Sequence, residues 1–251
     1  IRGFTTISER MTPETLVKFL NEYLTKMTDI VFKYDGLLDK YMGDALMAVW
    51  GAPLDQPDHT KRACYTALEM VGELHVLQEK WVAEGMPSLN IGIGINAGPM
   101  VVGNMGSERR FDYTVMGDSV NLGSRLEGLN KLYGTHIIVS EMTYERVHDE
   151  ILGRELDSVR VKGKDQPIRV YELLARYIQA SPEQKALAEG FHCALREYKN
   201  RNWDGALQAF QSILARNPHD GPAKLYVERC QTLKENPPPL DWDGVYTLTT
   251  K

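Results

Sequence analysis

The sequence predicts an α+β fold, in which helices cover one face of a sheet, followed by a small all-helical extension. Two patterns support this prediction. Up to about residue 175, apolar residues at helical spacing alternate with short apolar or β-branched runs that end at glycine or proline. From about Glu183 onward the strand pattern is absent. Helices mixed with antiparallel hairpins in this way are typical of an α+β sandwich.

Length and charge limit the classes of function. A chain of 251 residues suits one large domain, or one medium domain with an appendage. Its formal net charge of −5 argues against a general nucleic-acid binder, because a phosphate backbone requires a basic surface. Any polyanionic substrate must therefore meet local basic residues.

The cysteines and the hydropathy indicate a cytoplasmic protein. Cys64, Cys193 and Cys230 lie far apart without metal-ligand spacing, as expected of buried thiols in a reducing compartment. No apolar run approaches the roughly 20 residues of a membrane span, and no signal peptide is visible, so we expect no membrane contact. The chain begins at Ile1 without Met, so we expect a fragment of a longer protein.

The first elements are a short turn and a long helix. Residues 1–6 are expected to end a strand and to turn through Gly3 into a helix. Thr12, Pro13 and Glu14 provide an N-cap, a proline at the first helical position and an acidic first turn. Apolar residues then recur at helical spacing: Leu16, Phe19, Leu20, Tyr23, Leu24, Met27, Ile30 and Val31.

Two short apolar strands within residues 37–50 are predicted to join at Met42-Gly43-Asp44. Gly43 would supply the positive φ that a tight hairpin needs. Asp44 would stand at the tip, where a carboxylate is well placed to hold a hard cation such as Mg²⁺. An ordinary Gly-Asp turn explains these residues equally well, so the metal role stays open on this evidence alone.

The remaining elements of the first part alternate between helices and strands. We expect a second hairpin, in which the runs 91–95 and 100–102 pair through the turn Asn96-Ala97-Gly98-Pro99. The other expected elements are a helix over 59–84, a strand over 111–116, a helix from about 119 to 133, a strand over 136–140, a short helix over 141–147 and a closing strand over 168–174.

The last part resembles one tetratricopeptide repeat. Ala206, Phe210, Leu214 and Pro218 follow the pattern of its second helix, with Trp203 before them. A single repeat cannot bury its own apolar face, so it either packs on the preceding domain, as we expect, or lacks neighbouring repeats. The expected units are a catalytic domain over 1–177, this extension over 178–236 and an acidic-aromatic tail over 237–251.

Four separated motifs carry candidate chemistry. Backbone N–H groups near Ile1-Arg2-Gly3-Phe4-Thr5 could hold phosphates, and Asp44 could hold a metal. Asn121 and Arg125 are four residues apart on one helix face, which suits a ribose and a phosphate. Val161-Lys162-Gly163-Lys164 is a basic turn. Each motif alone is also explained by an ordinary solvated surface.

Together and in this order, the motifs resemble the class III nucleotidyl cyclase catalytic domain. They are Ile-Arg-Gly-Phe-Thr, Lys-Tyr-Met-Gly-Asp, Asn-x-x-x-Arg and Val-Lys-Gly-Lys, and the resemblance covers roughly residues 1–175. It implies a ferredoxin-like α+β core and a head-to-tail homodimer with active sites at the subunit interface. The implied reaction converts a nucleoside triphosphate to its 3′,5′-cyclic monophosphate and pyrophosphate.

The resemblance also implies roles for individual residues. Asp44 and the backbone carbonyl of Ile1 would bind the metal ions, two Mg²⁺ or Mn²⁺ per site. Lys40 and Thr114 would contact the purine. Asn121 would orient the ribose, Arg125 would stabilise the transition state, and Lys162 would contact the terminal phosphate, with Phe4 and Thr5 also binding the triphosphate.

Lys40 favours ATP as the substrate, because guanylate cyclases carry glutamate at this position. Threonine can donate or accept by rotating its hydroxyl, so Thr114 is expected to discriminate less than Lys40. Threonine at this place accompanies stimulation by bicarbonate among relatives, which we therefore also expect. Two alternatives stay open: a guanylate cyclase, and a catalytically silent dimerisation or interaction module.

Two further expectations come from the same resemblance. The family's other metal-binding aspartate immediately precedes the Ile-Arg-Gly-Phe-Thr motif, so it would lie just before Ile1. The C-terminal helices and the Asp-Trp-Asp-Gly-Val-Tyr tail resemble those of bacterial receptor-type cyclases. An upstream sensor domain is thus expected in the full-length protein, and in those relatives it is anchored in the membrane.

Overall fold

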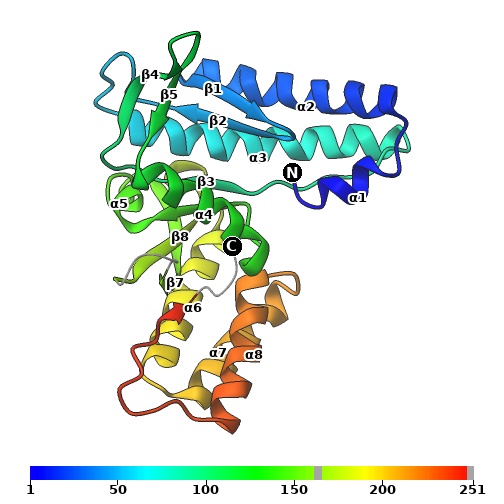
Figure 1. Cartoon of the computed structure of the whole chain (residues 1–251). Coiled ribbons are helices and arrows are strands. Elements are labelled where there is room, and N and C mark those ends of the chain that lie inside the picture. Colours follow the sequence, from blue (N-terminus) through cyan, green and yellow to red (C-terminus); the bar gives the residue numbers. More distant parts are fainter. Residues whose placement is uncertain (161–165, 248–251) are drawn as a thin grey trace.

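The computed structural model of the chain describes residues 1–160 and 166–247 and confirms an α+β architecture (Figure 1). At one end of the molecule, helices α2 (Pro13–Lys33) and α3 (His59–Ala83) lie side by side behind a two-stranded hairpin of β1 (Leu37–Met42) and β2 (Ala45–Val49). None of the helices in the described residues has the length and apolar composition that a membrane span requires.

The long predicted helix is α2, and its capping residues act as expected. Thr12 Oγ1 accepts a hydrogen bond from the backbone N–H of Thr15 at 3.3 Å, and Pro13 occupies the first helical position. Its apolar face packs on α3 in a buried cluster that includes Phe19, Tyr23, Met27, Ile30 and Val31 of α2 with Met70, Leu74, Leu77 and Trp81 of α3. A short helix, α1 (Phe4–Ser8), precedes it, and the described residues before α1 form no strand.

The central sheet has the order β3-β6-β8-β7-β9. These strands are β3 (Ile93–Ile95), β6 (Ile137–Ser140), β8 (Ile168–Arg176), β7 (Ile151–Arg160) and β9 (Tyr246–Thr247). β3 runs parallel to β6, and α4 (Asp118–Tyr133) packs on both strands. A second two-stranded sheet, β4 (Val101–Ser107) with β5 (Arg110–Met116), stands beside β1.

The predicted second hairpin is wrong. The run 91–95 pairs with β6, and β4 pairs with β5 instead. The expected turn is held by other elements: Asn96 Nδ2 donates to the carbonyl of Ser119 at 2.9 Å, and the backbone N–H of Ala97 donates to Thr143 Oγ1 at 2.9 Å. Strand β7 was not predicted. Its buried charges, Arg154 and Asp157, interrupt the alternation that marks a strand.

The helical extension folds around its own aromatic core and packs on the first domain. It comprises α6 (Pro182–Lys199), α7 (Trp203–Arg216) and α8 (Gly221–Glu235), after α5 (Glu141–Tyr144) and a 3₁₀ turn (Tyr177–Gln179). The Tyr226 hydroxyl donates to the carbonyl of Leu156 in β7 at 2.8 Å, and Arg154 pairs with Asp220 at 2.7 Å. The expected packing on the preceding domain is confirmed, whereas the tetratricopeptide identity stays a prediction.

The acidic-aromatic tail returns to the sheet. The Trp242 ring lies 5.5 Å from that of Tyr198 and 5.4 Å from that of Trp203, between ring centroids. Tyr246 then pairs with Val159 of β7 in register. The tail therefore covers the aromatic core of the extension and adds a strand to the edge of the central sheet.

Candidate active site

The start of the chain lies against the tip of the β1–β2 hairpin. The amino group of Ile1 is 2.8 Å from Asp44 Oδ2, and the backbone N–H of Arg2 donates to the carbonyl of Asn90 at 2.7 Å. The tip is a two-residue turn in which Gly43 has a φ of +65°, as predicted. Ile1 and Asp44, the two expected metal-binding residues, are thus adjacent in space.

The Asp44 carboxylate is a suitable ligand for a hard divalent cation. It is only 24% exposed and is anionic oxygen, the ligand type that Mg²⁺ prefers. Tyr23 lies close by: burial raises the pKa of its hydroxyl, and the charge of Asp44 raises it further. The described part of the chain contains no group of three or more His, Cys, Asp or Glu side chains that could hold a metal. A complete metal site therefore needs ligands beyond these.

A β-bulge in β1 brings the two expected purine-contacting residues to one carboxylate. Leu38 pairs with Ala48 and Lys40 with Met47, so Asp39 is the extra residue of the bulge. Successive side chains normally point to opposite faces of a strand, and a bulge can re-aim them. Asp39 Oδ1 lies 3.7 Å from Lys40 Nζ, and Asp39 Oδ2 accepts a hydrogen bond from Thr114 Oγ1 at 2.7 Å.

Helix α4 carries Asn121 and Arg125 and is seated directly on β3. A Cβ added at Gly94 would meet the backbone of Gly123 and Glu127 at impossibly short distances, so only glycine allows this approach. The side chains of Asn121 and Arg125 form no hydrogen bond or ion pair with residues 1–160 or 166–247. Both are available to a ligand or to a second chain.

The other predicted phosphate contacts are only partly described. Phe4 and Thr5 form the first turn of α1, where backbone N–H groups lack intrahelical acceptors. Gly3, which precedes them, has a φ of +64°. Lys162 lies outside the described residues.

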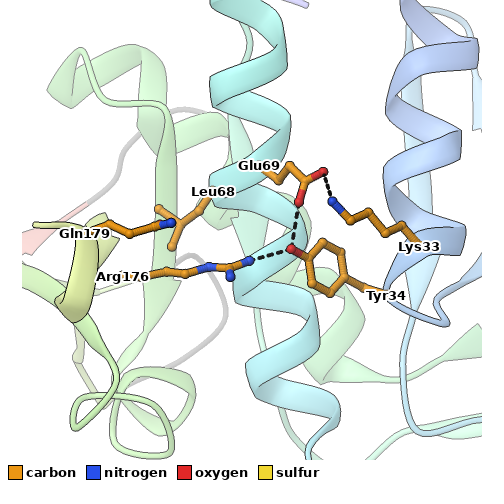
Figure 2. A pocket seen from close by; sticks show the side chains of 6 residues that line it. All are labelled: Lys33, Tyr34, Leu68, Glu69, Arg176 and Gln179. Atoms are coloured by element: carbon orange, nitrogen blue, oxygen red, sulfur yellow. Dashed lines mark hydrogen bonds and ion pairs between the residues drawn. The ribbon is translucent and has the colours of Figure 1, made fainter.

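A pocket of about 270 Å³ lies elsewhere, between α2, α3 and the end of β8 (Figure 2). Glu69 accepts hydrogen bonds from Lys33 Nζ at 2.6 Å and from the Tyr34 hydroxyl at 2.7 Å, and Arg176 donates to that same hydroxyl. Arg176 also stacks on the Tyr65 ring at 3.8 Å. The charged side chains that line this pocket are therefore paired with one another, and none of the predicted site residues lines it.

Two site residues were missed in the sequence. Asp39 sits beside Lys40 in the hairpin, where strand alternation assigns it to the other face, and only the bulge reveals its contact with Thr114. Gly94 reads as a glycine in an apolar run. A glycine inside a strand pattern signals a close backbone approach, so this signal was present.

Comparisons with known proteins identify the family of the chain. Residues 1–175 match the family described as adenylate and guanylate cyclase catalytic domain. Adenylate cyclase 1 of Rhizobium meliloti is 37% identical over 174 residues, which are 69% of this chain and 26% of that protein. An adenylate cyclase of Anabaena cylindrica is 38% identical over 182 residues, 70% of this chain and 35% of that protein. The chain thus spans only about a quarter to a third of these relatives.

Solved structures show the same fold. The adenylyl cyclase CyaB from P. aeruginosa is 35% identical, with a TM-score of 0.65 over 72% of this chain and 92% of that one. The guanylyl cyclase Cya2 is 36% identical, with a TM-score of 0.64 over 72% of this chain and 90% of that one. The chain belongs to the family of adenylate and guanylate cyclase catalytic domains.

Proposed function

We propose that this chain is the catalytic part of an adenylate cyclase that converts ATP to 3′,5′-cyclic AMP and pyrophosphate. The observation that carries the proposal is the arrangement of Lys40 and Thr114, which are far apart in sequence and meet at the Asp39 carboxylate. The neighbouring hairpin tip holds Asp44 next to Ile1. Relatives named adenylate cyclase at 37% and 38% identity support the same activity.

The reaction is a phosphoryl transfer, in which the 3′-hydroxyl oxygen attacks the α-phosphorus and the bond to the pyrophosphate oxygen breaks. Such reactions depend mainly on positioning and charge neutralisation. Arg125 would take up the charge that grows on the α-phosphate, and Asn121 on the same helix face would hold the ribose. The N–H groups of Phe4 and Thr5, with Lys162, would bind the outer phosphates.

Asp44 and the Ile1 carbonyl would hold divalent cations, Mg²⁺ or Mn²⁺, two per site. When bound, such ions lower the pKa of the attacking hydroxyl and neutralise the leaving pyrophosphate. Asp44 is the predicted carboxylate ligand, and within the described residues no group of three or more His, Cys, Asp or Glu side chains could hold a metal. The family resemblance implies a second metal-binding aspartate just before Ile1, and the proposal includes it.

A homodimer completes the proposed site. Asn121 and Arg125 have no side-chain partner in the described residues, and we expect them to contact a triphosphate held by Asp44 of the other copy. A two-fold symmetric pair would then contain two equivalent sites. The same proposal includes an upstream sensor domain. It also includes a response to bicarbonate, which the threonine at position 114 leads us to expect.

A guanylate cyclase is the second candidate, because the solved guanylyl cyclase Cya2 is as similar as the adenylyl cyclase. Lys40 argues against it. An ammonium only donates hydrogen bonds, and guanine N1 carries a proton of its own.

The decisive assay measures cyclic AMP and cyclic GMP formation by a protein form that extends before Ile1, with Mg²⁺ or Mn²⁺. We expect ATP to be preferred, and Asp44→Ala to abolish product formation while leaving the melting temperature and the oligomeric state unchanged. The carboxylate sits on a turn, so its loss should cost little stability. Near-normal activity of Asp44→Ala at saturating metal would refute its role, and preference for GTP would favour the second candidate.

A further inference from the structure

Asp39 is a buried carboxylate that the proposed reaction does not yet use. Its side chain is 1% exposed, although β1 is only partly buried. One oxygen accepts from the Thr114 hydroxyl at 2.7 Å. The other lies 3.7 Å from Lys40 Nζ and has no hydrogen-bond partner within residues 1–160 and 166–247. A buried carboxylate oxygen that lacks a hydrogen bond lowers the stability of the folded protein, which points to a function.

The hydrogen bond to Asp39 fixes what Thr114 can do. A hydroxyl has one hydrogen and two lone pairs, and a carboxylate only accepts. Because Thr114 donates its hydrogen to Asp39, its oxygen can only accept a further hydrogen bond. The sequence predicts that Thr114 adapts by rotating its hydroxyl, whereas in this structure that hydroxyl is already bonded to Asp39.

We propose that Asp39 is a positioning residue that makes the site select adenine over guanine, by holding Thr114 as an obligatory acceptor beside Lys40. This inference rests on the proposed cyclase function and on Lys40 and Thr114 contacting the base. It assigns a specificity role to a residue that touches no substrate itself.

The two side chains then match one purine edge. Adenine presents an acceptor at N1 and a donor at its 6-amino group, which suit the Lys40 ammonium and the Thr114 oxygen. Guanine presents the reverse pattern, a donor at N1 and an acceptor at O6. Without Asp39 the Thr114 hydroxyl could turn its hydrogen toward O6. With Asp39 in place both groups oppose guanine, and unpaired polar groups strongly disfavour the wrong base.

The test is the ratio of kcat/KM for ATP to kcat/KM for GTP in four variants. Asp39→Asn keeps the size and shape of the side chain, but an amide can donate to Thr114 as well as accept from it. The Thr114 hydroxyl is then no longer obliged to donate its hydrogen to residue 39. We expect the ratio to fall by at least about tenfold. Thr114→Val should lower it similarly, and Asp39→Asn should add nothing in the Thr114→Val background. Asp112→Asn, an exposed carboxylate on the same strand as Thr114, should leave the ratio unchanged.

The readout separates specificity from stability. A purely structural Asp39 would lower both kcat/KM values together and leave their ratio intact, which would overturn the inference. If Asp39→Asn does not fold, an unchanged ratio in Thr114→Val would overturn it equally. A wild-type protein that forms no cyclic nucleotide refutes the proposed function itself, whereas an active wild type with a ratio insensitive to Asp39→Asn refutes only the role of Asp39.

Discussion

Gly94→Ala should damage the site while leaving all of its polar side chains unchanged. An added Cβ would lie far inside 3.0 Å of Gly123 O and Glu127 N, both on the backbone of α4, whereas ordinary contact begins at 3.4 Å. Because neither atom belongs to a flexible side chain, α4 or β3 must move by about 1 Å. A displacement of about 1 Å in a catalytic group can cost about 10²-fold in rate.

We therefore expect Gly94→Ala to lower kcat for cyclic AMP formation by about 10²-fold and to reduce the free energy of unfolding by about 1–3 kcal/mol, the usual cost of overpacking. Both quantities can be measured in one protein preparation, by product formation and by urea unfolding.

Gly128→Ala is the matched control, because it adds the same methyl group to α4 itself where a Cβ meets nothing within 4 Å. Alanine is a better helix former than glycine, so this variant should be as active as the wild type and more stable by up to about 1 kcal/mol. If Gly94→Ala keeps wild-type activity and stability, the contact with β3 does not position Asn121 and Arg125.

Two further predictions concern stability. Arg229 of α8 pairs with the buried Asp157 of β7 at 2.6 Å, so Arg229→Met should lower the free energy of unfolding by about 3–5 kcal/mol, measured by urea unfolding. Lys234→Met is the control, because it breaks an exposed ion pair on the same helix. It should lower the free energy of unfolding by less than about 1 kcal/mol. Burial lowers the pKa of His136, so the unfolded chain binds more protons and stability should fall as the pH drops below about 6.5. Between about pH 7.5 and about pH 5.5, the free energy of unfolding should decline less in His136→Gln than in the wild type. An equal decline in both proteins would mean that other groups cause it.

Local signals in the sequence predicted much of the fold. The cap at Thr12, the proline at Pro13 and the helical apolar spacing define α2, and Gly43 defines the first hairpin. These features act within a few residues of the chain, so they are visible without the tertiary structure.

The sequence-based predictions fail where segments far apart in the chain determine the strand pairing. β3 pairs with β6 rather than with its neighbour in sequence, because α4 provides a crossover between them. β7 buries charged residues whose partners include Asp220 and Arg229 of the extension. Neither pairing has a local pattern.

The candidate site divides in the same way. The motifs contain Asp44, Asn121 and Arg125, and the structure adds how the first lies against Ile1 and how the other two are carried on α4. The role of Asp39 depends on a bulge and on a contact 75 residues away, which no spacing rule gives.

We propose that each active site is shared by two copies of this chain, and mixing two inactive variants tests this sharing most directly. Asp44→Ala and Arg125→Ala should each be inactive alone. In a heterodimer one site carries both lesions and the other carries neither, so an equal mixture should regain about a quarter of wild-type cyclic AMP formation, given random pairing and two sites per dimer. No recovery, with heterodimers shown to form by mass measurement, would contradict the shared site.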